Sequence, residues 1–235
     1  MKNFIRPHHQ RIAAVLQCFD ADYLKQHGIL FGGGTRIAMA LNEYRESTDI
    51  DFFCHSSGAY RAVRSQTTQH SLGELIKANY PFHLLREVRA DRDAVRTFVK
   101  SPIDETAIKL EFIHFDIPIN QEQQDGFDIP LVSRESCFTT KLLANADRYM
   151  QGVPKDIFDL CMMRKEWGVI PTSSWQLAAN CYGESTIANG LTNALNLFLK
   201  EPEKLLNLAM ENLKVEAELA YQLVHEIAPD FLKEI

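Results

Sequence analysis

The sequence predicts an α+β fold followed by an all-helical C-terminal part. Short strand-like runs alternate with helical patterns over the first 132 residues, whereas from about residue 133 onward apolar residues recur only at helical spacing. Hydrophobic residues make up 46% of the 235, which is enough to bury a sizeable core. We therefore expect an α+β core at 1–132 and a helical domain at 133–235.

The N-terminal part begins with a helix, a strand and a second helix. Apolar residues at helical spacing predict one helix over 8–27, which Gly28 would end. "ILF" (29–31) then predicts a short strand that Gly32 breaks, and a helical pattern follows at 35–43.

The middle of the chain adds strands and helices. We expect strands at 49–53, 82–88, 94–100 and 106–115, and helices at 58–66 and 71–79. The strand at 106–115 alternates, so that its apolar side chains face one way and Lys109 and Glu111 face the other.

The C-terminal part is predicted to be a series of helices. Ser133 is a suitable N-cap for the first of them, which carries Phe138, Leu142 and Leu143 on an apolar face. We expect further helices at about 154–167, 173–182, 186–199, 202–212 and 215–227.

Composition narrows the class of protein. No run of eighteen apolar residues predicts a membrane span, and the N-terminus lacks the pattern of a secretory signal. Five scattered cysteines without a CxxC pair argue against a disulfide framework or a cysteine zinc site, so we expect a cytoplasmic protein. The net charge of −6 argues against indiscriminate binding of nucleic acid but leaves room for a local basic face.

The stretch "GGGTRIAMALNEYRESTDIDFF" (32–53) carries the first functional motif. Residues i and i+2 of a strand project from the same face, so Asp49 and Asp51 point the same way. Adjacent carboxylates repel unless a positive charge lies between them, and Mg²⁺ (or Mn²⁺) is held by carboxylates together with substrate phosphates. The pair therefore predicts a metal site. The alternative is two exposed charges paired with Arg45.

The glycines before this strand predict a phosphate site. A Gly-rich turn lets the backbone N–H groups of Gly33 and Gly34 approach a phosphate, and a helix starting near Thr35 adds its positive end. The Thr35 hydroxyl is a further candidate donor. Taken with the two carboxylates, these residues predict a site for a metal and a nucleoside triphosphate, although three glycines are also typical of an ordinary turn.

A third carboxylate is expected where two metals assist phosphoryl transfer. Glu111 is the candidate, since it lies on the predicted strand 106–115 and faces away from the apolar side, together with Lys109. A structural ion pair between Glu111 and Lys109 is the alternative.

This order of elements resembles the nucleotidyltransferase superfold of the DNA polymerase β type. More narrowly, it is similar to the first motif of AbiEii/AbiGii-type toxins, in which Gly-Gly-Thr and a short helix precede Arg-x-Ser-x-Asp-[Ile/Leu]-Asp-Phe. The matching residues are Gly33, Gly34, Thr35, Arg45, Ser47, Asp49 and Asp51. The resemblance implies a nucleotidyltransferase-type mixed sheet with flanking helices, with these residues around the nucleotide and its metal.

Two downstream segments extend the resemblance. "IKLEF" is similar to the family's Lys-x-[Asp/Glu] strand, with Lys109 and Glu111 as the matches, although the family more commonly has Asp at the second position. "TKLLANADRYMQGVPKDIFDLCMM" is similar to its Lys-Leu-x-Ala…Arg…Asp-[Ile/Leu]-x-Asp-Leu segment. The matching residues there are Lys141, Arg148, Asp156 and Asp159.

Spacing supports this second segment independently. Lys141, Asn145 and Arg148 share one face of their helix, and Asp156 and Asp159 share a face of the next, which Pro154 would start. One interpretation is that Lys141 neutralises triphosphate charge, while the two aspartates position it or the nucleotide. The alternative is ordinary ion pairing between the two helices, for example of Lys141 or Arg148 with Asp159.

The resemblance implies transfer of a nucleoside monophosphate from an NTP to an acceptor hydroxyl by a toxin, with tRNA as acceptor and an antitoxin as partner. Alternatives are a small-molecule or protein acceptor, a non-catalytic nucleotide-binding module, or a metal-dependent phosphodiesterase. A tRNA acceptor predicts a basic face, for which the candidates are Arg86, Arg89, Arg92 and Arg96. A small-molecule acceptor predicts an acidic or apolar pocket instead.

Overall fold

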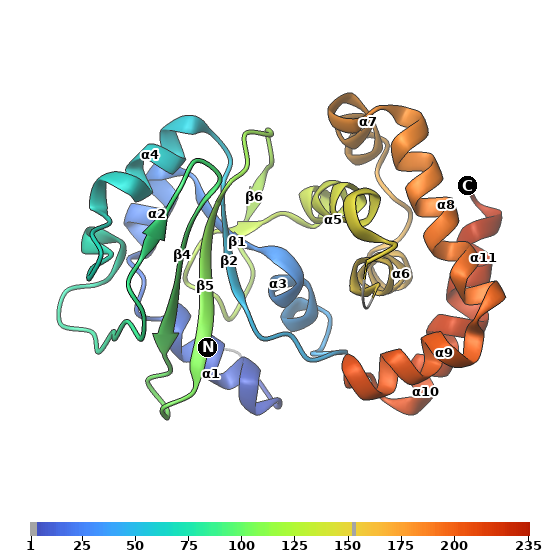
Figure 1. Cartoon of the computed structure of the whole chain (residues 1–235), viewed down its shortest axis with the longest axis horizontal. Helices are drawn as coiled ribbons and strands as arrows, with labels where there is room; N and C mark the ends of the chain where they lie inside the picture. The colour runs from blue at the N-terminus through green and yellow to red at the C-terminus, as the bar shows by residue number, and fades with distance from the viewer. Residues whose placement is uncertain (1–3, 152–153) are drawn as a thin grey trace. The chain divides into compact units, whose positions relative to one another are not determined.

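The chain forms two compact units. The computed structural model describes residues 4–151 and 154–235 (Figure 1). The first unit comprises the chain up to Met39 together with Ser47–Ser133, and the second comprises Ala40–Glu46 together with Arg134–Ile235. The segment Ala40–Glu46 therefore groups with the helical unit. The division of the chain into an α+β core at 1–132 and a helical domain at 133–235 stays a prediction.

The first unit is built on a mixed sheet, as the sequence predicts. Within the described residues the sheet has seven strands in the order β3-β4-β5-β2-β1-β7-β6. The strands are β1 (Ile29–Gly32), β2 (Ile50–Cys54), β3 (Arg89–Ala90), β4 (Ala94–Lys100), β5 (Ala107–His114), β6 (Gln121–Glu122) and β7 (Leu131–Val132). The helices are α1 (Pro7–Leu16), α2 (Ala21–His27), α3 (Gly33–Ala40) and α4 (Ser57–Gln66), with a short 3-10 turn, η1 (Gly73–Leu75).

One face of this sheet is packed and the other carries charge. Phe52 on β2 and Phe112 on β5 are fully buried and stack with their ring centroids 5.1 Å apart. Residues of α1, α2 and α4 complete the same apolar core, and these helices lie along one side of the sheet in Figure 1. Since side chains of a strand alternate between faces, Asp51 and Glu111 project from the opposite face. The predicted alternation of 106–115 is confirmed.

The predicted helix over 8–27 is wrong in its centre. The structure has two helices, α1 and α2, separated by residues 17–20. The Asp20 side chain caps α2 by accepting a hydrogen bond from Tyr23 N at 2.8 Å, which favours a new helix start over a continued one. Phe19 is fully buried, with its ring 4.9 Å from that of Phe52, so tertiary packing overrides the helical periodicity.

Two other expectations are corrected in part. The predicted helix at 71–79 is only the turn η1, because Gly73 adopts a positive φ of 54° that a helix does not accommodate. The predicted strand at 82–88 is limited to a single bridge between Leu84 and Val99, and the regular strand β3 begins at Arg89. The short strands β6 and β7 were not predicted.

The second unit is helical, as expected. Its elements are α5 (Arg134–Arg148), α6 (Lys155–Trp167), α7 (Thr172–Tyr182), α8 (Glu184–Lys200), α9 (Pro202–Asn207), η2 (Leu208–Asn212), α10 (Ala217–Gln222), η3 (Leu223–Ile227) and α11 (Ala228–Lys233). Helix α5 packs against α6, α7 and α8, and a run of its residues from Ser136 to Leu143 is buried on every side. The helix-rich pattern from residue 133 onward is thus confirmed.

The last two predicted helices extend through π-helical turns. The helix expected at 202–212 corresponds to α9 and η2, and the one at 215–227 continues through η3 into α11. Pro229 in the first turn of α11 lacks a backbone N–H, and this interrupts the regular hydrogen-bond ladder. Pro154 precedes α6 as its N-cap residue instead of starting it. No helix among the described residues has the length and apolar character needed to cross a membrane.

Candidate functional site

The register of the sheet places four charged residues in one row. Arg89 on β3 pairs with Arg96 on β4, Arg96 with Glu111 on β5, and Glu111 with Asp51 on β2. Asp51 is in turn opposite Gly32 on β1. Paired positions on neighbouring strands project from the same face, so this row lies on the sheet face opposite to the apolar core.

Gly33 forms a close cradle for the Asp51 carboxylate. It follows β1 directly and has a φ of +69°, which L side chains rarely adopt. A Cβ atom at this position would lie 2.3 Å from Asp51 Oδ2, well inside van der Waals contact. Only glycine therefore allows both the turn into α3 and this position of the carboxylate. Gly34 follows in the first turn of α3, where backbone N–H groups are still without helical partners.

Thr35 and Ser47 hold the loop that leads into β2. Thr35 is buried, and its hydroxyl donates to the Asp49 carbonyl oxygen at 2.5 Å and lies 2.8 Å from Ser47 Oγ. The Ser47 backbone N–H donates to His9 Nε2 at 3.3 Å. These contacts give Thr35 a structural partner where the sequence suggested a phosphate donor. They fix Asp49 immediately before β2, where Thr48 Oγ1 donates to its carboxylate at 3.3 Å.

Glu111 lies between two cations. Arg96 Nε donates to Oε1 at 2.8 Å, and Lys109 Nζ donates to Oε2. The Glu111 side chain is 15% exposed, whereas those of Arg96 and Lys109 are 42% and 38% exposed. The ion pair with Lys109 that sequence reasoning left open is therefore present, and Arg96 is a second partner that it missed.

These residues fit a divalent cation in donor chemistry. Asp49, Asp51 and Glu111 offer only carboxylate oxygens, which Mg²⁺ and Mn²⁺ prefer, and Asp51 and Glu111 are neighbours in register. The Gly33 cradle leaves space for the Asp51 carboxylate at the beginning of α3. Across residues 4–151 and 154–235, however, no three His, Cys, Asp or Glu side chains are already grouped as metal ligands. Asp49, Asp51 and Glu111 are therefore not already arranged as a three-ligand metal site.

The second unit contains a buried ion-pair network around Asp159. Arg45 binds this carboxylate through two nitrogens of its guanidinium, at 2.7 Å from Nε to Oδ1 and 2.9 Å from Nη2 to Oδ2. Lys141 Nζ lies 2.6 Å from Oδ2, and the Tyr44 hydroxyl donates to Oδ1. Arg45 thus pairs with Asp159, and the alternative in which it pairs with Asp49 and Asp51 is wrong.

Asp156 extends the network along α6. It accepts from Lys141 Nζ at 2.8 Å and from Arg148 Nε at 2.6 Å, and Arg148 alone of these residues is half exposed. Burial opposes the charged carboxylate of Asp159, but Arg45 and Lys141 outweigh it and lower its pKa. Burial likewise opposes the charge on Lys141, yet Asp159 and Asp156 raise its pKa. Lys141, Asp156 and Asp159 are therefore charged at neutral pH, and the predicted sharing of helix faces leads to ion pairs.

Sequence reasoning missed several residues that shape these sites. Arg36 on α3 is 1% exposed and donates from Nε to the Val132 carbonyl oxygen at 3.0 Å, which ties the start of α3 to β7. The sequence did not single out Tyr44 as a partner of Asp159, because aromatic residues are common in protein cores. Arg96 could have been found: strands 94–100 and 107–114 flank a short connection, and an antiparallel hairpin places Arg96 opposite Glu111.

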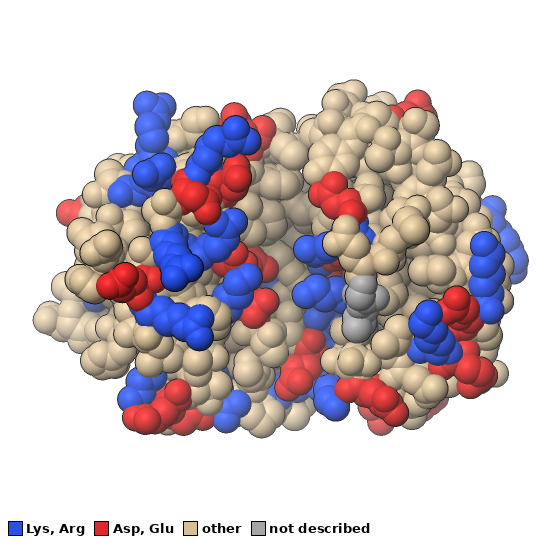
Figure 2. All heavy atoms as spheres, viewed as in Figure 1, with Lys and Arg blue, Asp and Glu red and all other residues tan. Residues whose placement is uncertain are grey.

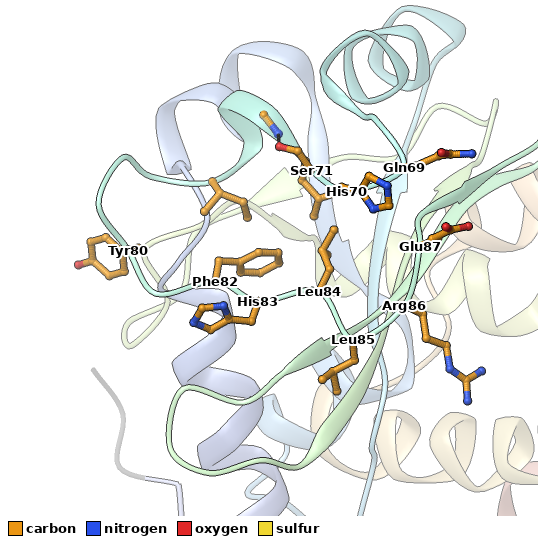
Figure 3. Close-up of a pocket in the computed structure, with 13 residues that line it drawn as sticks. Gln69, His70, Ser71, Tyr80, Phe82, His83, Leu84, Leu85, Arg86 and Glu87 are labelled. Carbon is orange, nitrogen blue, oxygen red and sulfur yellow. Dashed lines mark hydrogen bonds between the residues drawn. The ribbon is translucent and has the colours of Figure 1, made fainter.

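A separate pocket lies at the edge of the sheet beside β4. It has a volume of about 550 Å³ and is lined by residues 69–73, 76, 80 and 82–87. Leu84 points toward the segment that carries His70 and Ser71, whereas Arg86 points away from it (Figure 3). Arg86, a candidate for the RNA-binding face, lines this pocket, whereas the residues predicted for the metal and the nucleotide do not. The pocket is therefore distinct from the row that contains Asp51 and Glu111.

Comparisons with known proteins identify a family and a fold for this chain. Residues 14–230 match the family described as "Nucleotidyl transferase AbiEii toxin, Type IV TA system". A crystal structure from H. pylori, provisionally assigned as a nucleotidyltransferase, is similar with a TM-score of 0.55 and 17% identity, covering 97% of this chain and 94% of that one. JHP933 from Helicobacter pylori gives 0.54 and 17%, with 97% and 91% covered. At this identity the two structures show the fold alone. No curated protein matches the sequence.

Proposed function

Because the chain belongs to the AbiEii family of nucleotidyltransferase toxins and is a nucleotidyltransferase, we propose that it modifies tRNA in a metal-dependent reaction. An NTP is the donor substrate, and a hydroxyl of the tRNA accepts the nucleoside monophosphate. The type IV toxin–antitoxin family implies an antitoxin as partner.

One observation carries the metal-dependent part of the proposal. Asp51 and Glu111 lie side by side on neighbouring strands, and the Asp51 carboxylate rests against Gly33 at the start of α3. Carboxylates beside a glycine turn and a helix N-terminus suit a cation bound to phosphates. Asp49, Asp51 and Glu111 would hold the cation, which would supply electrostatic stabilisation of the phosphate charge when bound.

The chain's own residues then have distinct roles. The backbone N–H groups of Gly33 and Gly34 bind the β- and γ-phosphates, and Thr35 positions the loop of Asp49 through its hydrogen bond. Glu111 takes the proton from the acceptor hydroxyl. The acceptor oxygen forms a bond to the α-phosphorus, the bond from that phosphorus to the bridging oxygen of the β-phosphate breaks, and pyrophosphate leaves.

The role of the Lys141 network stays a prediction. In this proposal Lys141 neutralises triphosphate charge, Asp156 and Asp159 position that lysine or the nucleotide, and Arg45 and Arg148 belong to the nucleotide-binding residues. The buried ion pairs of Lys141 with both aspartates favour at least a structural role. Substitution of Lys141 tests which role dominates.

An RNA acceptor is supported by exposed arginines at the edge of the sheet. Arg86, Arg89 and Arg92 are exposed, and Figure 2 shows Lys and Arg side chains over β4 and β5 with acidic side chains among them. Arg96 was expected in this face, but it is directed to Glu111 and Asp91. Guanidinium groups bind the phosphates of an RNA backbone and stack on unpaired bases. The exposed arginines therefore favour RNA over a small molecule as the acceptor.

The proposal is tested by incubating the protein with each α-³²P-labelled NTP, Mg²⁺ and total tRNA, with Asp51→Ala as control. We expect labelled RNA with the wild type alone. Label on the protein or on a small molecule would identify that molecule, instead of tRNA, as the acceptor. Release of nucleotide without incorporation would indicate a phosphodiesterase. Equal labelling by Asp51→Ala would overturn the site assignment.

A further inference from the structure

Arg96 is held at both ends. Its Nε donates to Glu111 Oε1 at 2.8 Å, and its Nη1 donates to Asp91 Oδ2 at 2.5 Å. Arg96 lies on β4 and Glu111 on β5, where the two positions are paired in register. One guanidinium therefore connects the acidic row of the sheet to the turn between β3 and β4.

The Asp91 carboxylate is itself held in place by hydrogen bonds. Its Oδ1 accepts hydrogen bonds from the backbone N–H groups of Asp93 at 2.7 Å and Ala94 at 2.9 Å, which closes the turn. These backbone bonds, with a further contribution from Arg96, lower the pKa of Asp91, so its carboxylate is charged at neutral pH. The hydroxyl of Tyr60 on α4 also donates to the Asp91 carbonyl oxygen at 2.7 Å. The turn is thus anchored to the packed part of the unit.

Glu111 keeps the capacity to bind a cation in this arrangement. A carboxylate has about four lone-pair sites, two on each oxygen. Arg96 uses one on Oε1 and Lys109 uses one on Oε2, which leaves one on each oxygen. The glutamate side chain is flexible, so its carboxylate loses conformational freedom when it binds a cation.

We propose that Arg96 is a positioning residue that, anchored by Asp91, holds the Glu111 carboxylate beside Asp51 and so raises the affinity of the site for its cation. This inference rests on the proposed function, because it takes Asp51 and Glu111 as the ligands. Arg96 thereby restricts the motion of the flexible Glu111 side chain. Groups that orient metal ligands typically change metal affinity by about 10- to 100-fold when they are removed.

The test is a titration of the purified protein with Mn²⁺ alone, in which free Mn²⁺ is measured by electron paramagnetic resonance. Glutamine is too short to span both carboxylates, so we expect Arg96→Gln to weaken binding about tenfold or more. Asp91→Asn keeps the oxygen that closes the turn but removes the charge that anchors Arg96, so a smaller loss is expected. Arg61→Gln on α4 removes the same charge from an exposed position and should leave binding unchanged.

The outcomes separate this inference from the function on which it rests. Unchanged binding in Arg96→Gln, with the wild type binding Mn²⁺ and Asp51→Ala not binding it, overturns the inference alone. Tighter binding also overturns it, because Arg96 would then compete with the cation. If the wild type binds no Mn²⁺, the proposed metal site fails as well. If circular dichroism shows that Arg96→Gln does not fold, Asp91→Asn decides, and unchanged binding in that variant overturns the inference.

Discussion

Lys141 and Asp159 form a buried ion pair, with 2.6 Å between Nζ and Oδ2 and side chains that are 5% and 0% exposed. Arg45 binds the same carboxylate, so Asp159 has a cation on each oxygen. Such a pair adds little net stability compared with apolar residues, because both charges lose their hydration. Loss of one partner is different, since the other charge stays buried without compensation.

We predict that Lys141→Met lowers the free energy of unfolding by about 3–5 kcal/mol, because two buried aspartates lose a cation. Urea denaturation followed by the fluorescence of Trp167 and Trp175 measures this change. Lys165→Met is the control, since Lys165 pairs with neighbouring Glu166 near the surface. If both variants unfold alike and nucleotidyl transfer is lost only in Lys141→Met, the lysine acts on the nucleotide instead.

Stability should fall in acid because of Asp156 and Asp159. Burial opposes the charged forms, yet neighbouring cations lower both pKa values below that of the unfolded chain. A carboxylate with a depressed pKa stabilises the fold above its unfolded value, about 3.9, and this stabilisation is lost as pH falls below it. We expect a constant free energy of unfolding from pH 7 to about 5 and a decline below about pH 4. Urea denaturation at each pH provides the measurement.

Asp156→Asn gives the matching control for the acid prediction. One titrating carboxylate is removed, so the decline between pH 5 and pH 3 should be smaller than in the wild type, even though the variant is less stable at pH 7. A wild-type stability that is independent of pH down to 3 would contradict the lowered pKa values of both aspartates.

The sequence predicted those features that depend on local periodicity. Alternation along 49–53 and 106–115 assigns Ile50 and Leu110 to the core and Asp51 and Glu111 to the opposite face, and the structure has them there. Strand periodicity is a property of neighbouring residues, so it can be seen without knowledge of the rest of the chain. The start of α5 directly after Ser133 is predictable for the same reason.

Features that depend on distant partners could not be predicted in this way. The break between α1 and α2 follows from the packing of Phe19 against Phe52, thirty-three positions away. Arg45 matches a motif next to the Asp-x-Asp strand, yet its partner is Asp159 on α6. A charged side chain pairs with whichever opposite charge the fold buries beside it, and local spacing does not specify that residue.

Asn145 is expected to be a weak point of α5. Its side chain is 1% exposed, and among the described residues neither its amide nitrogen nor its oxygen has a hydrogen-bond partner. Leucine has the same branching without polar atoms, so we predict that Asn145→Leu raises the free energy of unfolding by about 1 kcal/mol. A loss of stability in urea denaturation would contradict this and indicate a buried water bound to the amide.

The cradle of Gly33 gives the sharpest prediction about the active site. An alanine Cβ would lie 2.3 Å from Asp51 Oδ2, and φ at this residue is +69°, so Gly33→Ala must displace the carboxylate and strain the turn. We expect a stability loss of about 1–2 kcal/mol and a loss of nucleotidyl transfer far larger than this destabilisation explains. Gly58→Ala in the first turn of α4 is the control, because its Cβ would meet only Ser56 Oγ at 3.6 Å. Transfer and melting temperature, measured on both variants, decide the point: a Gly33→Ala protein with full transfer activity would show that Asp51 does not act from its position beside the start of α3.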